Sequence, residues 1–281
     1  MVSRAHPRRP PLRRPRDESA TGTLVALLLA TLVPLVLAAV ALGWRPPLPD
    51  LGPLRVLLNG REAPPAAGPT LPGSPLPQGW FFPADGANGA GFAVTDTAGA
   101  PFWTALQELG GPGTLGFPLS HRFECDGAPC QLFQRGLLRA DPATGAVKVG
   151  ALLDELHAAG FDEQLAAYWG IPAVELPASG EPAADQWAER VNGWLAEYPP
   201  LRQYLAETPA ARRLLGLPTS AVHDVGAFYI ARFQNSALQQ WKADMPWAAA
   251  GAVTPVNVGE IAVTLGYFGG EPLVPQPAPA Q

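Results

Sequence analysis

The chain has 281 residues, of which 47% are hydrophobic, a share that supports a folded core in one or two small domains. Six of the 19 basic residues but only two of the 24 acidic residues fall within residues 1–20, which leaves 13 basic against 22 acidic residues in the remainder. That net charge of −9 argues against nucleic acid as a partner, because an acidic surface repels phosphate groups.

An uncharged apolar segment follows the arginine-rich start. Residues 21–44 contain the run Leu24–Leu42, which is long enough as a helix to cross a bilayer. A basic tail at residues 1–20 stays in the cytoplasm, so we expect a single-pass protein of the cell membrane, in contact with lipid, whose C-terminal region is extracytoplasmic. A signal peptide cleaved near Ala41 is the alternative, and it would export the same region. The tail itself either sets this topology beside anionic lipid or docks a cytoplasmic partner.

Proline marks the boundaries of the exported region. Ten of the 34 prolines lie in residues 45–79, which predicts a semi-rigid linker rather than a helix or sheet. A second linker at 171–183 separates a first unit, residues 80–170, from a second unit, residues 184–268. Residues 269–281 are predicted to form a disordered tail.

The two units are expected to contain short helices and strands. Pro101 suits the first turn of a helix that ends at Gly110. Later elements are predicted as strands at 121–125, 130–134, 137–140 and 146–149, a helix at 151–159, helices from Asp185, Pro199 and Pro209, and strands at 227–234 and 237–242. The predicted fold class is α+β, with a transmembrane helix and proline-rich stalk before two related units of short helices and antiparallel β-hairpins.

A six-residue block occurs twice, 100 residues apart. The first block, residues 115–120, reads LGFPLS, and the second block, residues 215–220, reads LGLPTS. The same offset aligns Phe133-Gln134 with Phe233-Gln234, which indicates duplicated units that share a core. Within each block, glycine allows a sharp turn, proline sets the exit of the chain and serine bonds to the turn.

At these residues the chain resembles the LGFP-repeat family of bacterial cell-surface proteins. One clear copy lies near 101–150 and a degenerate copy near 201–250. The residues that carry the resemblance are Trp103, Gly110, Gly111, Leu115, Gly116, Phe117, Pro118, Ser120 and Phe133 in the first copy, and Leu215, Gly216, Pro218, Ser220 and Phe233 in the second. The resemblance implies an exported module that associates with the cell wall, and it implies structural roles for these residues and no catalytic ones.

Cys125 and Cys130 bracket four residues that suit a hairpin loop. Residues directly opposed across such strands are about 4.5–5.5 Å apart at Cα, a separation that a disulfide accepts. Since an exported domain is in an oxidising compartment, we predict a Cys125–Cys130 disulfide. A zinc site that adds His121 is the alternative, but it lacks a fourth ligand, so neither a metal nor a cofactor is predicted.

No residue pattern in the chain compels a catalytic assignment. The neighbours that suggest catalysis are Ser120 with His121, Ser220 with His223 and Asp224, Asp154 with Glu155, and Asp162 with Glu163. Catalytic triads seldom consist of sequence neighbours, and no nucleophile-elbow motif occurs. A glycosidase needs two carboxylates about 5–10 Å apart, whereas adjacent helical carboxylates point to different faces. We therefore predict no catalytic residues and no enzyme.

Tryptophan offers the remaining binding signal. Trp241 and Trp247 flank a proline-containing loop and are the predicted glycan contacts, whereas the spacing of Trp187 and Trp194 places both on one helical face, in the core. We predict a membrane-anchored extracytoplasmic binding or scaffold protein that associates with cell-wall polysaccharide or with a membrane protein partner. The alternatives are a hydrolase of wall glycan or peptide that uses acidic residues, and a structural accessory subunit of a membrane complex.

Overall fold

The computed structural model describes residues 71–97, 99–178, 180 and 183–279. The predicted basic tail, transmembrane helix and most of the proline-rich linker fall in residues 1–70, outside the described part of the chain. No helix of the described residues is both long enough and apolar enough to cross a bilayer.

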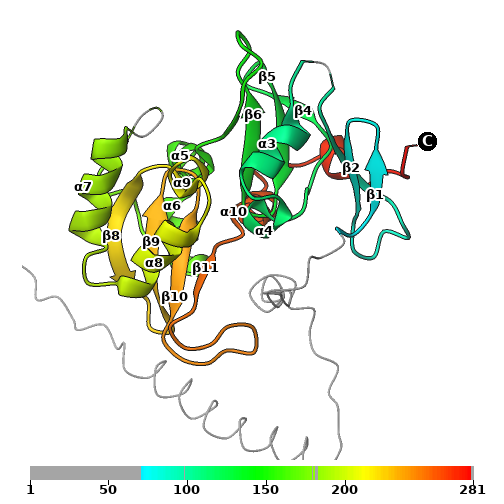
Figure 1. The fold of residues 1–281 in the computed structure, drawn as a ribbon. Helices are drawn as coiled ribbons and strands as arrows, with labels where there is room; N and C mark the ends of the chain where they lie inside the picture. Colours follow the sequence, from blue (N-terminus) through cyan, green and yellow to red (C-terminus); the bar gives the residue numbers. More distant parts are fainter. Residues whose placement is uncertain (1–70, 98, 179, 181–182, 280–281) are drawn as a thin grey trace, which may run out of the picture. The chain divides into compact units, whose positions relative to one another are not determined.

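The described part of the chain is α+β, with three small antiparallel sheets and several short helices (Figure 1). The first sheet consists of β1 (Ser74–Leu76), β2 (Gly79–Pro83) and β3 (Gly91–Thr95). The second consists of β4 (Phe123–Cys125), β5 (Ala128–Phe133), β6 (Gly136–Ala140) and β7 (Val147–Val149). The third consists of β8 (Pro218–Asp224), β9 (Phe228–Phe233), β10 (Ala237–Trp241) and β11 (Val253–Pro255). Both four-stranded sheets keep their strands in chain order, so each is a simple meander.

Short helices precede and follow each four-stranded sheet. They are α3 (Phe102–Glu108), α4 (Pro112–Leu115), α5 (Leu152–Ala158), α6 (Asp162–Trp169), α7 (Ala184–Trp194), α8 (Pro199–Glu207), α9 (Ala211–Leu215), α10 (Val258–Thr264) and the 3₁₀ turn η1 (Glu271–Leu273). Pro112 and Pro199 stand in the first turns of α4 and α8, where a missing amide proton costs no helical hydrogen bond.

The two blocks make the same contacts with a glutamine on the strand that follows. The main-chain nitrogen of Gln134 donates to the main-chain oxygen of Phe117 at 3.0 Å, and the side-chain Oε1 of Gln134 accepts from the main-chain nitrogen of Phe117 at 2.9 Å. Gln234 repeats both bonds with Leu217, at 3.0 and 2.8 Å. Each glutamine thus bonds to both main-chain groups of the residue that follows the block glycine, as a neighbouring strand would.

The block serines are buried and complete this arrangement. Ser120 Oγ accepts a hydrogen bond from the amide of Leu132 at 2.9 Å, and Ser220 Oγ accepts one from the amide of Arg232 at 3.2 Å. These contacts satisfy backbone donors that would otherwise be buried without a partner.

Glycine is required in each block by both conformation and space. Gly116 and Gly216 have φ angles of 77° and 74°, in the region that disfavours side chains. A Cβ atom on Gly116 would lie 2.6 Å from Cβ of Gln134, and one on Gly216 would lie 2.7 Å from Cβ of Gln234. The close approach of glutamine to the turn therefore depends on glycine.

Each copy is continued by the helix that follows its four-stranded sheet, α5 after the first and α10 after the second, and the start of that helix bonds to the other copy. α10 comes after β11, yet the amide of Gly259 at its start donates to the main-chain oxygen of Gln134 at 2.9 Å. α5 comes after β7, and the amide of Leu153 donates to the main-chain oxygen of Gln234 at 3.0 Å. In Figure 1, α10 accordingly lies beside the sheet that contains β6. The two copies are interlocked.

Two hydrophobic clusters follow from this exchange. One joins α3 and β5 of the first copy to α8 and β9 of the second, with Leu106, Phe133, Leu201 and Phe233 all fully buried. The other packs α5 and α10 against strands of both meanders. Both clusters draw on residues 80–170 and 184–268, so the two predicted units share their cores.

Two segments predicted to lack regular structure pair with the first sheet. Residues 74–76, at the end of the predicted linker, form the edge strand β1, where Pro75 is compatible with pairing along one side. In the predicted tail, Gln276 exchanges hydrogen bonds with Gly91 at 2.7 and 3.0 Å, and Pro272 accepts from the amide of His121 at 2.8 Å. The described part of the tail is therefore held by residues that are distant in the chain, and local composition gives no sign of such partners.

Replacing the block glycines should destabilise the protein. Gly116→Ala and Gly216→Ala are each expected to cost at least about 1–3 kcal/mol, because alanine is strained at positive φ and its Cβ would displace the glutamine. Gly113→Ala, in α4 with open space around its Cα, is the matched control and should be neutral or slightly stabilising. Urea unfolding of the full chain in detergent measures all three, and a Gly116→Ala protein as stable as the control would contradict the role given to the turn.

Candidate functional site

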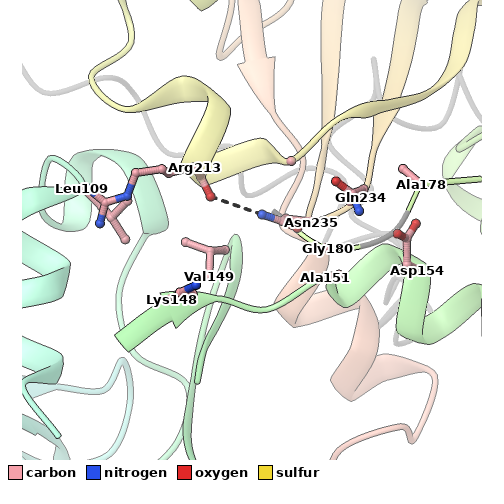
Figure 2. A pocket seen from close by; sticks show the side chains of 11 residues that line it. Leu109, Lys148, Val149, Ala151, Asp154, Ala178, Gly180, Arg213, Gln234 and Asn235 are labelled. Atoms are coloured by element: carbon pink, nitrogen blue, oxygen red, sulfur yellow. Dashed lines mark hydrogen bonds between the residues drawn. The ribbon is translucent and has the colours of Figure 1, made fainter. Parts of the chain in front are cut away.

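A cleft of about 490 Å³ opens at the second block, where the start of α5 meets the turn between β9 and β10 (Figure 2). Small-molecule sites commonly have volumes of about 300–1,000 Å³. Residues of both copies and of the segment between them line this cleft: Leu109, Lys148, Val149, Ala151, Asp154, Ala178, Gly180, Arg213, Gly216, Gln234 and Asn235. The interlock of the two copies therefore creates a concave surface that neither copy forms alone.

The charged side chains of the cleft are separated by sign. Figure 2 shows Arg213 and Lys148 toward one end and Asp154 at the other. Asn235 lies between them, and its side-chain nitrogen donates to the main-chain oxygen of Arg213 at 3.3 Å. Arg213 also faces Glu108 at 3.8 Å, but both side chains are exposed, and such ion pairs contribute little in water. A ligand anion can compete for this end of the cleft.

Asp154 is the carboxyl group that lines the cleft, and its pKa is shifted. It stands in the first turn of α5, half-buried, with its side chain hydrogen-bonded to that of Gln234. Burial raises the pKa of Asp154 to about 6, although the Gln234 bond and the charges of Arg232 and His157 act in the opposite direction. The carboxyl therefore gains and loses its proton close to neutral pH.

A fully buried arginine supports this end of the cleft. The guanidinium of Arg232 on β9 donates to the main-chain oxygens of Leu153 at 2.7 Å and Pro172 at 2.8 Å. It also donates to Asp162 Oδ1 at 2.8 Å. These bonds tie α5, α6 and the segment after α6 to the second meander.

Asp162 links the buried arginine to the surface. Its second oxygen lies 2.5 Å from Nδ1 of His157, which is exposed on α5. Burial alone would raise the pKa of Asp162, but the hydrogen bonds from Arg232 and His157 together outweigh burial and lower it. Asp162 is thus committed to an ion pair within the fold.

The two acidic pairs predicted from the sequence are not assembled into one site. Asp154 lines the cleft, whereas its neighbour Glu155 forms an ion pair with Arg139 at 3.0 Å. Asp162 binds Arg232, and Glu163 is exposed on α6. Asp154 is the single carboxyl group among the residues that line the cleft.

The serine and histidine neighbours have contacts that hold the backbone. Ser120 and Ser220 are buried against strand amides, as described above. His121 Nε2 lies 3.0 Å from the oxygen of Val274, and His223 Nε2 lies 2.5 Å from Oε1 of Glu175. Each histidine thus pairs with a group other than a block serine.

The predicted disulfide between Cys125 and Cys130 is present. The turn differs from the expected four-residue loop, because Asp126 and Gly127 alone form it, both with positive φ, as in the tight hairpin turns that favour Asp-Gly. The cysteines are therefore diagonal rather than directly opposed, with a Cα–Cα distance of 5.9 Å. Because each sulfur is bonded to the other, the alternative zinc site has no thiolate ligands.

The two tryptophans predicted to contact glycan lie together, but they differ in exposure. Trp241 is only 7% exposed, and its ring nitrogen donates to Thr254 Oγ1 at 3.0 Å. Its ring packs edge-on against Trp247, with centroids 5.7 Å apart. Trp241 is thus part of the sheet packing and has little free face, whereas Trp247 is partly exposed. Trp187 and Trp194 pack against the core, as expected from their spacing.

Three polar residues of the cleft, Lys148, Arg213 and Asn235, were not predicted from the sequence, because they belong to no motif by themselves. Gln234 belongs to the Phe-Gln pair that recurs at the 100-residue offset, and Asp154 to one of the acidic pairs. The signal lay in the comparison of the two copies, since the 100-residue offset replaces Arg135 of the first copy by Asn235.

Comparison with known proteins adds no family. No protein-family model matches the chain, and no curated protein matches it in sequence. The resemblance to LGFP repeats therefore stays a prediction that depends on the residues of the two blocks.

The raised pKa of Asp154 predicts a stability difference that depends on pH. Between pH 4 and 6 the folded protein holds a proton that the unfolded chain has released, so the stability contributed by Asp154 is present below pH 4 and is lost as pH rises through about 6. The free energy of unfolding of Asp154→Asn, measured relative to that of the wild type, should therefore be higher at pH 8 than at pH 4 by about 1–2 kcal/mol, after allowance for the partial exposure of the group. Urea unfolding at the two pH values tests this.

Glu163→Gln on the exposed face of α6 is the matched control, because it corrects for the loss of one negative charge. An Asp154→Asn effect of the same size at both pH values would show that the carboxyl is not destabilised by burial.

Removal of the buried arginine should be among the most damaging substitutions. Arg232→Met is expected to lower the free energy of unfolding by about 3–5 kcal/mol, because Asp162 and two carbonyl groups lose their donor. Adding Asp162→Asn should recover part of that loss. Arg202→Met on the exposed face of α8 should change stability by less than about 0.5 kcal/mol. Equal effects of Arg232→Met and Arg202→Met in denaturant unfolding would disprove the role of Arg232.

Proposed function

We propose that this protein is a membrane-anchored extracytoplasmic binding module that associates with the cell wall through the cleft at the second block. The apolar segment 21–44, preceded by six arginines, is the proposed anchor, with its N-terminus in the cytoplasm. The Cys125–Cys130 disulfide supports export, because such bonds persist in oxidising compartments. Residues 45–70 of the proline-rich segment would hold the folded part away from the bilayer.

The observation that carries the proposal is the cleft itself. It is concave, its lining comes from both copies, and it presents charges of both signs and two amide side chains, Gln234 and Asn235. Polar groups converging in a cleft of this volume are typical of ligand sites. The LGFP resemblance of the blocks points to wall material as the ligand. The proposed repeat fold positions the cleft, because each block anchors the other copy's helix.

A binding role fits the cleft better than the alternative of a glycan hydrolase. A glycosidase acts through two carboxyl groups about 5–10 Å apart, and Asp154 is the single carboxyl in the lining. An accessory subunit of a membrane complex would be favoured by a wide apolar surface. Among the described residues the exposed large hydrophobic side chains are Tyr168, Leu176, Val225 and Val274. A cleft with a charged lining is the more specific feature.

The proposal is tested by retention on insoluble cell-wall material. The full chain in detergent should sediment with the wall at moderate salt, and Asn235→Arg, which places a long side chain in the cleft, should reduce retention by about tenfold. Trp247→Ala measures the contribution of the partly exposed tryptophan, and Arg202→Met on α8 is the surface control.

Loss of retention in the Asn235→Arg protein alone would support binding through the cleft. Loss in Trp247→Ala alone would place wall binding at the tryptophan loop instead. If the wild type is not retained, the wall-binding proposal fails.

A further inference from the structure

The place that corresponds to the cleft in the first copy is filled by side chains. There the guanidinium of Arg135 donates to the main-chain oxygens of Gly113 at 2.7 Å and Thr114 at 3.3 Å. Its Nε donates to Asn257 Oδ1 at 3.4 Å, and Asn257 in turn donates to Glu260 Oε2 at 3.0 Å. A chain of polar side chains thus runs from the block to the start of α10.

The second copy keeps the backbone contacts but shortens the side chains. Asn235 donates to the main-chain oxygens of Arg213 and Leu214, the residues that correspond to Gly113 and Thr114, at 3.3 and 3.1 Å. On the helix, α5 begins at Leu152 and α10 at Val258, so Ala151 corresponds to Asn257 and Asp154 to Glu260. Arginine, asparagine and glutamate are therefore replaced by asparagine, alanine and aspartate, and each replacement is smaller.

The consequence is open volume beside a carboxyl group. In the first copy, Gln134 Nε2 donates to Glu260 Oε1 at 2.9 Å, and the charge of Arg135 interacts with Glu260. In the second copy the Gln234 bond to Asp154 is kept, but the cation on the cleft side is replaced by the shorter, neutral Asn235. Asp154 still has Arg232 and His157 near it, on the side of the fold rather than of the cleft. A cationic group of a ligand can take the place that Arg135 occupies in the first copy.

The other end of the cleft favours the opposite charge. Arg213 stands where the first copy has Gly113, so the second copy adds a cation at this end while it loses one near Asp154. Lys148 lines the same end. The polarity of the cleft is thus set by two substitutions in opposite directions.

We propose that the cleft binds a zwitterionic, peptide-like ligand, with its ammonium group at Asp154 and its carboxylate group at Arg213 and Lys148. The amide side chains of Gln234 and Asn235 lie between the two ends and suit a ligand with peptide groups. This inference depends on the proposed function and deepens it, because it makes the peptide portion of wall material the ligand rather than its polysaccharide.

The test uses chemically matched probes of different length. Isothermal titration of the full chain in detergent with di-, tri- and tetra-alanine and with 6-aminohexanoate should show binding of at least one zwitterion. For that probe, acetylation of the amine or amidation of the carboxylate should each weaken binding by about tenfold or more, because each removes one charged contact.

Variants of the protein separate the two ends. Asp154→Asn should remove the penalty for amine acetylation, and Arg213→Gln should remove much of the penalty for amidation. Ala151→Asn combined with Asn235→Arg, which recreates two of the three side chains of the first copy, should abolish binding while the unfolding midpoint stays close to that of the wild type. Glu260→Gln, outside the cleft, is the matched control and should leave binding unchanged.

The outcomes distinguish this inference from the function on which it depends. Failure of every zwitterion to bind, or binding that is indifferent to capping, would overturn the inference. If wall retention persists in that case and is lost in Asn235→Arg, the cleft binds another component and the proposed function stands. If wall retention fails too, both proposals fall.

Discussion

The structure depends on two glutamine residues, each of which serves a turn and a helix at once. The side-chain oxygen of Gln134 accepts from Phe117 while its main-chain oxygen accepts from the start of α10, and Gln234 does the same for Leu217 and α5. A helix start has amide groups without helical partners, and burying them unpaired is costly. Each glutamine supplies that partner to the helix that follows the other meander, so both helix starts depend on contacts between the copies. The two hydrophobic clusters also form across both copies.

This interlock explains how two similar meanders can form one cleft between them. Both copies have the glycine, glutamine and serine that make the turn. The glutamine and serine satisfy backbone groups, and the glutamine lies too close to the glycine for any side chain there. The side chains that follow the two glutamines, Arg135 and Asn235, do not take part in the bonds between the glutamine and the turn. Arg135 fills its position in the first copy, whereas Asn235 satisfies the corresponding carbonyl groups with a short side chain and leaves a cleft. The proposed site therefore lies where the two copies differ.

Two charged residues near the cleft differ in how well the fold stabilises their charges. Arg232 is completely buried, and its two terminal nitrogens donate to two carbonyl groups and Asp162, which fixes α5 and α6 in place. Asp154, the residue that follows Leu153, is held in a partly buried position that raises its pKa and destabilises its charged form. A charge that is poorly solvated in the free protein gains more from an incoming cation than a charge in open water does. The charged form of Asp154 is therefore poorly stabilised in the free protein.

Local sequence signals determined most of the secondary structure and the duplication. The prolines at helix starts and the repeated glycine-proline blocks act within a few residues, so the strands of the second sheet, the helices that begin near Pro199 and Pro209 and the disulfide were predictable. The two-residue Asp-Gly turn between the cysteines was not predicted. The first sheet, the pairing of Gln276 with Gly91 and the burial of Trp241 were not, because their partners are distant in the chain. The cleft was decided by tertiary structure for the same reason. Asp154 follows the first meander and Asn235 belongs to the second, and only the exchange of helices between the copies brings a carboxyl group, two cations and two amides around one space.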